Sequence, residues 1–566
     1  MRWSPLPLPN EQKAKALQQE IGVPYEIACL LLQRGIEDFD TAKSFFRPEL
    51  SDLLDPFLML GMQEAVDRIF QAIEKDEKIM VFGDYDVDGT TAVALVYSFL
   101  NKSHPNCIYY IPDRYEEGYG VSTQGIDYAK ANNVNLIIAL DCGIKAVDKV
   151  AYAQTLGIDF IICDHHLPGS QLPEAIAILD PKQADCPYPF KDLCGCGIGF
   201  KLIHALTLYI GGTINDIIDY MDLVAMAIAA DIVPMKGENR ILTHFGIKQI
   251  QENPRVGIRS FVGQLKRKLN VSDLVFIIAP RINGAGRIKH GSHAVALLLS
   301  EDIEEALSRS RAIELYNSER KELDQKITLQ ALDQIKQNEE ESFYSTVVFQ
   351  PDWHKGVIGI VASRLIETYY RPTVVFAASG NYYTASVRSV KGVDVYQILE
   401  ACKEHIVQFG GHRYAAGLTI KPESYLSFKK AFEWAVAEVI EPEQRIPSTA
   451  FDLELSLDKI TPKLYRIMSQ MAPFGPGNMR PVFLTKDCLD GGKTKAVGED
   501  QSHLKLEVTD DSKTTLEGIG FGMANHISRI KGRDPFQILY TVEENEFRGV
   551  KSLQLKLKDL KFEVNS

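Results

Sequence analysis

The chain has 566 residues, of which 45% are hydrophobic and 24% charged, and its formal net charge is −13. This length exceeds a single hydrophobic core and predicts about three or four domains in a globular protein. The acidity argues against a broad basic surface that coats nucleic acid, although a narrow basic channel fits it because phosphate contacts depend on local Lys and Arg. The sequence has no signal-like start and no apolar stretch of roughly 18 residues, so we expect a cytoplasmic protein that does not contact a membrane.

The patterning divides the chain into five predicted segments, of which residues 1–60 are helical. Between residues 61 and 235, short apolar runs alternate with helical patterns, which is typical of βαβ units and a parallel sheet. Residues 236–342 include a long charged stretch with spaced apolar positions, which predicts a solvent-exposed connecting helix. A second α/β segment follows over 343–440. Residues 448–566 alternate at period two, which predicts an all-β module with an OB-like barrel as one candidate. The predicted fold class is therefore α/β, with this β module at the end.

Three apolar runs in the first third of the chain each end on acidic residues, at 78–89, 135–143 and 159–166. The carboxyl ends of parallel strands form the ligand crevice of an open α/β sheet, so these side chains should converge. Like charges at close range raise one another's pKa, and divalent metal is the simplest counter-charge. Mixed carboxylate and imidazole ligands suit Mn²⁺ well and Mg²⁺ somewhat less. The pattern thus predicts a metal-dependent enzyme, with these candidate residues: Asp84, Asp86, Asp88, Asp141, Asp164, His165 and His166.

Each acidic motif has another interpretation. A histidine pair such as His165–His166 is more often a chance feature of the surface, but this one directly follows an apolar run and Asp164. The sequence GDYDVDG also fits the start of an EF-hand calcium loop, but the preceding strand and Leu95 at the twelfth loop position disfavour that. Asp141 by itself would be a common helix cap, and its value comes from repetition beside the other strand ends. The spacing of Cys186, Cys194 and Cys196 lacks a fourth ligand at a usual distance, so we do not expect a zinc site.

A second set of motifs, in the later half of the chain, has the character of a phosphate site. In TASVRS, Ser386 and Arg388 stand two residues apart, so the arginine could clamp a phosphate while the serine donates a hydrogen bond. The segment FGGHRYAAG supplies a glycine turn, Gly410–Gly411, beside His412. A surface arginine on a strand and a glycine-rich strand-to-helix turn explain these residues equally well.

Arginines also occur in two glycine-containing motifs, PDRYEEGYG (112–120) and PRINGAGR (280–287). This sequence is turn-like, where an arginine can reach into a cleft. Tyr115 and Tyr119 could stack on bases, an interaction worth about 1–3 kcal/mol per base in proteins that bind single strands. Each of these residues taken singly is more often a packing residue. The arginines concerned are Arg114, Arg281 and Arg287.

Together these motifs closely resemble the DHH phosphoesterase superfamily and, within it, the RecJ family of single-strand-specific exonucleases. The resemblance rests on GDYDVDGTTA (83–92), DCG (141–143), DHH (164–166) and AADIVP (229–234). The two arginine motifs, SVRS, FGGHRYAAG and PFGPGN fit the same family, and the terminal β module continues the match.

The resemblance implies a 5′-to-3′ exonuclease that degrades single-stranded DNA to nucleoside 5′-monophosphates by two-metal hydrolysis, in DNA repair and recombination. It implies two Mn²⁺ or Mg²⁺ ions on Asp86, Asp88, Asp141, His165 and Asp231. It gives catalytic roles to Asp84, Asp164 and His166. It assigns substrate binding to Arg114, Tyr119, Arg281, Asn283, Arg287, Ser386, Arg388, Gly410, Gly411 and His412. The family also suggests a single-strand-binding protein and a helicase as partners, and the multi-domain clamp suggests a monomer.

Two rival functions fit part of the sequence. A DHH enzyme for very short oligonucleotides or cyclic dinucleotides would share the first two domains, but the residues after 448 favour a long polymeric substrate. A non-catalytic scaffold that binds single strands or replication proteins could lose its metal ligands freely, whereas this chain keeps the whole constellation. The exonuclease is therefore the predicted function.

Overall fold

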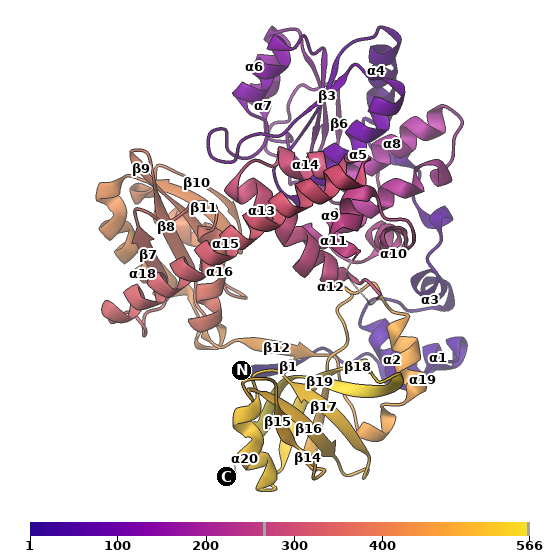
Figure 1. Ribbon diagram of the computed structural model, residues 1–566, viewed down its shortest axis with the longest axis vertical. Helices are drawn as coiled ribbons and strands as arrows, with labels where there is room; N and C mark the ends of the chain where they lie inside the picture. The colour runs from indigo at the N-terminus through magenta and orange to yellow at the C-terminus, as the bar shows by residue number, and fades with distance from the viewer. Residues whose placement is uncertain (264–267, 563–566) are drawn as a thin grey trace. The chain divides into compact units, whose positions relative to one another are not determined.

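The computed structural model describes residues 1–263 and 268–562, and it divides into two compact units (Figure 1). The first unit joins three stretches of the chain, Met1–Asp55, Ile232–Ile247 and Ser448–Ser566. The second unit comprises Pro56–Asp231 and Lys248–Pro447. Within the described ranges, no helix is both long enough and apolar enough to cross a membrane.

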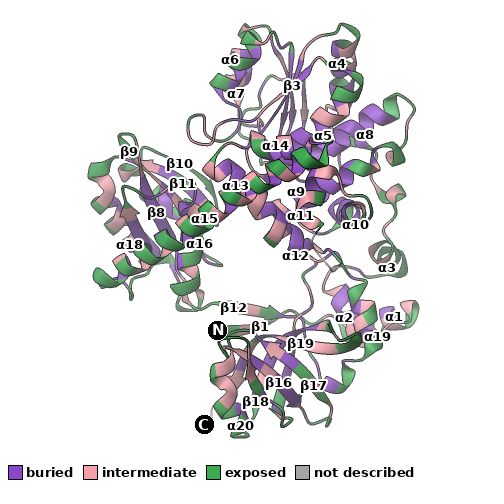
Figure 2. Ribbon diagram, viewed as in Figure 1, coloured by how far each residue is buried: buried purple, intermediate pink, exposed green. Residues whose placement is uncertain are grey.

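The second unit begins with a sheet of five parallel strands in the order β3-β2-β4-β5-β6, which confirms the predicted parallel sheet. Every residue of β2 and β4 is buried (Figure 2), as expected of a parallel sheet with helices on both faces. Helices α6 and α7 cover one face, while α4, α5 and α8 lie on the other (Figure 1). The elements are η2 (Pro56–Leu58), α4 (Met62–Glu74), β2 (Ile79–Gly83), α5 (Val87–Ser103), β3 (Cys107–Tyr110), α6 (Thr123–Ala131), β4 (Leu136–Leu140), α7 (Val147–Thr155), β5 (Asp159–Cys163), β6 (Ala177–Leu179), α8 (Gly195–Tyr209), η3 (Ile214–Tyr220) and α9 (Met221–Asp231).

The strand order of this sheet reverses beside β2, because β3 pairs with one of its edges and β4 with the other. In open α/β sheets a ligand crevice forms outside the carboxyl ends of the strands at such a reversal. The turns that leave β2, β4 and β5 therefore begin at the edge where a site is expected.

A helical connector follows, and its longest member, α15, runs for 35 residues with one face buried about every third or fourth residue. This confirms the predicted long connecting helix, of which only the opposite face is exposed. The prediction of a turn at residues 280–287 is wrong, because they lie in helix α13. Gly284 and Gly286 there let the helix approach Asn317 and Tyr85 closely, so these glycines serve packing. The elements are α10 (Gly237–Glu252), whose residues up to Ile247 belong to the first unit, α11 (Val256–Val262), α12 (Val271–Asp273), η4 (Leu274–Ile278), α13 (Ala279–Ile288), α14 (Ser292–Leu298) and α15 (Ile303–Gln337).

The second unit ends in a mixed sheet of order β10-β11-β9-β8-β7, in which only β7 and β8 are parallel. Helices α17 and α18 pack on one face, and α15 and α16 on the other. The predicted glycine turn at Gly410–Gly411 is wrong, since both residues lie within β10 and the chain reverses after His412. The elements are β7 (Thr346–Gln350), α16 (Ile358–Thr368), β8 (Thr373–Ser379), β9 (Tyr382–Arg388), α17 (Val395–Ala401), η5 (Lys403–His405), β10 (Gln408–His412), β11 (Ala415–Ile420), η6 (Pro422–Ser424), α18 (Tyr425–Val439) and η7 (Pro442–Arg445).

The first unit is built on a closed barrel, because β14, β18, β19, β17 and β16 pair in sequence and β16 pairs again with β14. Five strands closed in this way confirm the predicted OB-like module; it also carries the helices α19 and α20. Its elements are β12 (Ser448–Phe451), β13 (Leu453–Glu454), η8 (Leu457–Lys459), α19 (Pro462–Ser469), β14 (Phe483–Asp490), β15 (Lys495–Val497), β16 (His503–Thr509), β17 (Thr515–Gly520), η9 (Ala524–His526), α20 (Ile527–Lys531), β18 (Phe536–Phe547) and β19 (Val550–Phe562).

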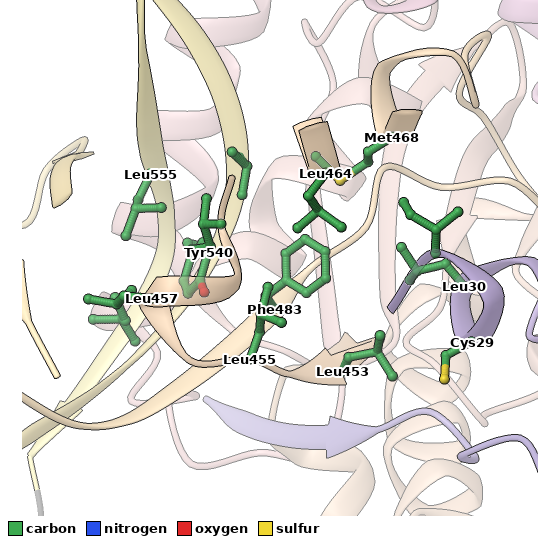
Figure 3. Close-up of a cluster of buried hydrophobic side chains, with 14 of the residues drawn as sticks. Cys29, Leu30, Leu453, Leu455, Leu457, Leu464, Met468, Phe483, Tyr540 and Leu555 are labelled. Atoms are coloured by element: carbon green, nitrogen blue, oxygen red, sulfur yellow. The ribbon is translucent and has the colours of Figure 1, made fainter. Parts of the chain in front are cut away.

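The N-terminal segment belongs to the same unit as the barrel and shares its core. Figure 3 shows Leu30 beside Phe483 and Leu464 in one cluster of buried side chains. Strand β1 pairs in parallel with β12, so the segment is not wholly helical. Its elements are β1 (Arg2–Pro5), α1 (Glu11–Ile21), α2 (Tyr25–Leu32), α3 (Phe39–Phe46) and η1 (Leu50–Asp52).

Candidate active site and metal centre

The turn from β2 into α5 carries the first three acids. Asp84 directly follows the strand, and Asp86 caps the helix by accepting a hydrogen bond from Gly89 N at 3.1 Å. Asp88 lies in the first turn of α5 and accepts hydrogen bonds from the amides of Gly195 and Cys196, both at 2.7 Å. Those amides open helix α8, where unsatisfied N–H groups and the helix dipole favour a carboxylate. The motif is therefore a strand-to-helix turn and not a calcium loop.

Two groups of three potential metal ligands meet at His165. One group is Asp141, His165 and His166, and the other is Asp88, His165 and Asp231, with the ligand atoms of each within 4.8 Å of one another. His165 Nε2 lies 3.2 Å from Asp141 Oδ1, 3.7 Å from Asp231 Oδ2 and 3.9 Å from Asp88 Oδ2. The structure thus brings together the segments that follow β2, β4 and β5, as the strand-end argument predicts, and adds Asp231 at the end of helix α9.

Asp141 reaches this position through an unusual backbone conformation. Its φ is +60°, in the left-handed region that a non-glycine residue seldom adopts, and such strain is frequent at functional sites. A Cβ on Gly195 would lie 2.5 Å from the Asp141 Cβ. The start of α8 can therefore approach the end of β4 only because residue 195 is glycine.

Asp164 organises the two histidines. Its Oδ1 accepts hydrogen bonds from the amides of His165 and His166, and its Oδ2 accepts one from Ile144 N at 2.9 Å. The Nδ1 of His166 also donates to Asp164 Oδ1 at 2.7 Å. On the other side of that ring, His166 Nε2 lies 3.2 Å from the hydroxyl of Tyr119, which donates to Asp141 O at 3.1 Å. Asp164 consequently fixes the backbone of both histidines and the ring of His166.

The electrostatics of the cluster favour a cation. Burial, followed by the charge of Asp86, raises the pKa of Asp88 to about 7, and burial together with Asp88 raises the pKa of Asp231 to about 8. Burial and the neighbouring acids likewise raise the pKa of Asp84 and of Asp141 well above the ordinary value. Both carboxylate oxygens of Asp84 are buried without a hydrogen bond in the described part of the chain.

The pKa values of the two histidines are shifted in opposite directions. Burial and the charge of His166 lower the pKa of His165 to about 3, so His165 is the neutral imidazole that a metal requires. Burial alone would lower the pKa of His166, but its hydrogen bond to Asp164 and the surrounding carboxylates raise it overall. Neutral imidazole, several carboxylates and unsatisfied buried oxygens fit Mn²⁺ or Mg²⁺.

Arg114, Ser386 and Arg388, predicted to hold a phosphate, also lie near one another in the second unit. Arg388 Nη1 donates to Ser386 Oγ at 3.0 Å, and both side chains face the first turn of α16, where a Cβ on Gly359 would lie 2.9 Å from Ser386 Oγ. Arg114 stacks over the ring of Tyr85 at 4.4 Å. Burial and then the charge of Arg114 lower the pKa of Arg388. Clustered guanidinium groups at a helix N-terminus are suited to an anion.

The remaining predicted residues belong to neither ligand group, and the two arginines among them bind other groups of the protein. Arg287 donates to Gly356 O at 3.0 Å, while Arg281 pairs with Glu314 and also donates to Ile277 O. Asn283 is half-buried on α13, and Gly410 and Gly411 are exposed on β10. Burial and the charges of Lys145, His166 and Lys182 lower the pKa of His412.

Two residues that the sequence reasoning missed belong to the same edge of the sheet. Asp180 directly follows β6, and burial raises its pKa to about 7. Its Oδ1 accepts a hydrogen bond from Lys182 N at 2.8 Å, and Lys182 Nζ donates to the carbonyl of His165. The signal was present in the sequence as a further apolar run that ends on acid, IAILD at residues 176–180.

Comparison with known proteins agrees with this geometry. Residues 78–228 match the DHH family, N-terminal domain, residues 339–438 the DHHA1 domain and residues 451–559 the RecJ OB domain. The single-stranded-DNA-specific exonuclease RecJ of Bacillus subtilis is 35% identical over 564 residues, which are 99% of this chain and 70% of the relative. The chain belongs to the RecJ family.

Other members of the RecJ family extend the comparison. The Escherichia coli single-stranded-DNA-specific exonuclease RecJ is 33% identical over 88% of this chain and 90% of its own length. The crystal structure of RecJ from Thermus thermophilus, a complex with Mn²⁺, superposes with a TM-score of 0.86 at 25% identity and covers 100% of this chain and 80% of that one. A manganese complex of a relative with this fold agrees with the donor set described above.

Proposed function

We propose that this RecJ-family chain is a metal-dependent exonuclease specific for single-stranded DNA, which removes nucleoside 5′-monophosphates from the 5′ end. The observation that carries the proposal is the pair of ligand groups sharing His165, in the same unit as the Arg114–Ser386–Arg388 cluster. The ligand groups would carry out the cleavage, and the arginine and serine cluster would recognise the end of the DNA chain. The relatives named above are named single-stranded-DNA-specific exonucleases, which supports the substrate and the exonuclease reaction of this proposal.

The proposed metal ligands are Asp86, Asp88, Asp141, His165 and Asp231, which would hold two Mn²⁺ or Mg²⁺ ions. When bound, two such ions lower the pKa of a water molecule and neutralise charge on the phosphoryl oxygens. The protein fixes the ligands through α8, whose amides hold Asp88, and through the left-handed turn at Asp141. Asp84, buried beside them without a hydrogen bond in the described structure, would complete the negative charge around the ions.

His166 is the proposed group for the charge that develops on the scissile phosphate. Asp164 accepts from its Nδ1 and raises its pKa, so the opposite nitrogen can carry a proton toward the substrate. The hydroxyl of Tyr119 lies 3.2 Å from that nitrogen, and a phosphate oxygen is proposed to take its place there when DNA binds. No side-chain nucleophile is needed, and the proposal includes no covalent intermediate.

Direction follows from anchoring the terminal phosphate. Ser386 and Arg388 lie against the N-terminus of α16, and the charge of Arg114 acts on Arg388, so the three are proposed to bind a 5′-phosphate. A chain end fixed there would present one scissile bond to the ligand groups in each cycle. Arg281, Asn283 and Arg287 are proposed to guide the backbone behind it, together with Gly410, Gly411 and His412.

The decisive experiment uses a 5′-phosphorylated single strand of forty nucleotides with Mn²⁺, labelled at either end. We expect immediate release of mononucleotide from the 5′ label, progressive shortening of the 3′-labelled strand and an intact blunt duplex. Asp141→Asn should abolish all of these, while Asp127→Asn, a substitution in helix α6, should leave them unchanged. Rapid cleavage of dinucleotides without attack on the long strand would assign the chain to the short-oligonucleotide enzymes instead.

The proposal extends to the assembly. A helicase would generate the single strands, a single-strand-binding protein would present them, and the enzyme would act as a monomer. Sedimentation of the protein alone measures its oligomeric state, and the nuclease rate with and without each partner measures the effect of the helicase and of the single-strand-binding protein. A sedimenting dimer, or a nuclease rate unaffected by either partner, would contradict this part of the proposal.

A further inference from the structure

The loop between β3 and α6 is organised by its own side chains. Glu117 accepts hydrogen bonds from Asp113 N at 2.7 Å and from the hydroxyl of Tyr110 at 3.0 Å, and Ser122 also donates to it. Asp113 in turn accepts a hydrogen bond from Tyr115 N at 2.7 Å. These hydrogen bonds hold the loop together, and Arg114 is the residue before Tyr115 in it.

Tyr115 fastens this loop to two other segments of the second unit. Its hydroxyl donates to the carbonyl of Arg287, near the end of α13, and its ring lies 4.7 Å from Lys355 Nζ and 5.8 Å from the ring of His354. Arg287 itself donates to Gly356 O at 3.0 Å. A Cβ at Gly356 would collide with the Tyr115 hydroxyl, so the tyrosine occupies a position that only glycine leaves open.

These contacts argue against base stacking by Tyr115. The cation of Lys355 lies over the ring, and the hydroxyl is used by a backbone carbonyl. A residue engaged in this way on both its ring and its hydroxyl acts on the protein and not on the substrate. Any role of Tyr115 in DNA recognition therefore depends on another residue that Tyr115 holds in position.

The residue that Tyr115 positions is its neighbour Arg114, whose positive charge is unfavourable beside the other arginines and therefore needs to be held in place. Burial and then the charge of Arg114 lower the pKa of Arg287 and of Arg388, as expected of like charges that lie in the same region. Arg114 is carried by the β3–α6 loop, whereas Ser386 and Arg388 stand over Gly359, three residues after Gly356. The two halves of the phosphate cluster thus lie on segments that meet at Tyr115.

We propose that Tyr115 is a positioning residue for recognition of the 5′ end: its hydroxyl holds the β3–α6 loop against α13 and so keeps Arg114 opposite Ser386 and Arg388. This inference rests on the proposed function and adds to it a residue that does not touch the DNA. It predicts that the Tyr115 hydroxyl sets the preference for a phosphorylated over a hydroxyl 5′ end.

The first test is Tyr115→Phe, assayed on forty-nucleotide single strands that carry a 5′-phosphate or a 5′-hydroxyl. We expect KM for the phosphorylated strand to rise about fivefold, the size of one lost hydrogen bond, with kcat unchanged. KM for the 5′-hydroxyl strand should stay the same, because Arg114 has no phosphate to hold there. Tyr152→Phe is the matched control, since Tyr152 on α7 also loses one hydroxyl hydrogen bond, to Asp127 Oδ1 at 2.7 Å.

The second test asks whether Tyr115 works through Arg114. In an Arg114→Ala background, Tyr115→Phe should cause no further loss of preference for the phosphorylated end, because residues acting as one unit are not additive. An additive loss, or an equal rise in KM for both strands, would overturn the proposal and leave a general structural role. Dissociation constants for the same strands, measured by fluorescence anisotropy without metal, give the same ratio without hydrolysis. Inactivity of the unmodified protein would therefore refute the exonuclease proposal alone, while this ratio would still decide the role of Tyr115.

Discussion

At the scale of single residues, the site depends on a carboxylate outside the proposed set of metal ligands. Asp164 holds the backbone of His165 and His166 with one oxygen, and the same oxygen fixes the ring of His166. The three residues of the DHH sequence therefore act together. The aspartate orients both histidines, the first histidine faces the acids and the second has a raised pKa. The histidine pair would have little use without the acid that precedes it.

Replacing Asp164 with asparagine tests whether this carboxylate orients the two histidines. Asp164→Asn keeps the shape but weakens the bond to His166 Nδ1, so we expect the rate of hydrolysis or the affinity for Mn²⁺ to fall about 10–100-fold, as for other groups that orient metal ligands. Steady-state kinetics and a manganese titration measure the two effects. A variant with unchanged kinetics would show that Asp164 only caps the turn.

The raised pKa values of two proposed ligands, Asp88 and Asp231, predict how the metal-free protein responds to pH. Folded Asp88 and Asp231 keep their protons up to about pH 7 and 8, whereas their unfolded pKa is near the ordinary value of 3.8. The folded state thus binds more protons, so this stabilisation is complete below the unfolded pKa and is lost as pH rises to about 8. In EDTA, we expect Tm to fall between pH 5 and pH 8.

Two comparisons check the cause of that pH dependence. Mn²⁺ should raise Tm more at pH 8 than at pH 6, because at the lower pH it must displace protons from the carboxylates. Asp231→Asn should flatten the decline of Tm in EDTA. A metal-free protein whose Tm rises steadily over the same range would contradict the assignment.

At the scale of elements, the site is an arrangement of chain ends. Strands β2, β4 and β5 deliver acids at their carboxyl ends, and helix α8 presents its N-terminus to Asp88. This meeting point requires close approach, which Gly195 permits by lacking a Cβ next to Asp141. A helix start thus contributes as much to the ligand geometry as the strands do.

Gly195→Ala should separate these elements. The added methyl would lie 2.5 Å from the Asp141 Cβ, so we expect Asp141 to move away from His165 and exonuclease activity to fall at least about tenfold, as when a positioning group is lost. Gly197→Ala is the matched control on the same helix, because its Cβ would meet neighbours at 3.4 Å or more. Activity, manganese affinity and Tm distinguish a displaced ligand from a misfolded protein. Equal effects of the two substitutions would refute the argument.

At the scale of the whole molecule, the chain forms two units with separate cores. The first unit is assembled from both ends of the chain and the stretch Ile232–Ile247, while all proposed metal ligands belong to the second. Arg240 ties the first unit together by donating to the carbonyls of Phe45, Met471, Ala472 and Pro473. The predicted division into five domains, with boundaries near residues 60, 235, 342 and 448, stays a proposal that limited proteolysis can test.

Separate cores predict separate responses to mutation. Phe483 is fully buried in the first unit, so Phe483→Ala should destabilise that unit by about 3–5 kcal/mol. The affinity for Mn²⁺, which belongs to the second unit, should be unchanged, and Mn²⁺ should stabilise only one of two denaturation transitions. Urea unfolding followed by circular dichroism and manganese titration measures both. A single transition shifted by both changes would show that the units unfold as one.

Much of this architecture could be predicted because the signals are local. The alternation of strands and helices, the long helix α15 and the period-two module at the end follow from spacing along the chain. The glycines in residues 280–287 and at Gly410–Gly411 misled the prediction, because a glycine can serve a turn or a close contact. Gly286 lies against Tyr85, a residue some two hundred positions earlier, and nothing in the local sequence indicates that contact.

The sequence by itself determined that acids and histidines follow successive buried strands, and this sufficed for a metal site and a family. Only the tertiary structure decided which atoms meet: that His165 joins both ligand groups, that Lys182 reaches its carbonyl and that Tyr115 closes on Arg287. The physical reason is range. Strand and helix patterns depend on neighbours along the chain, whereas hydrogen bonds and charges act between groups that folding brings within a few ångströms.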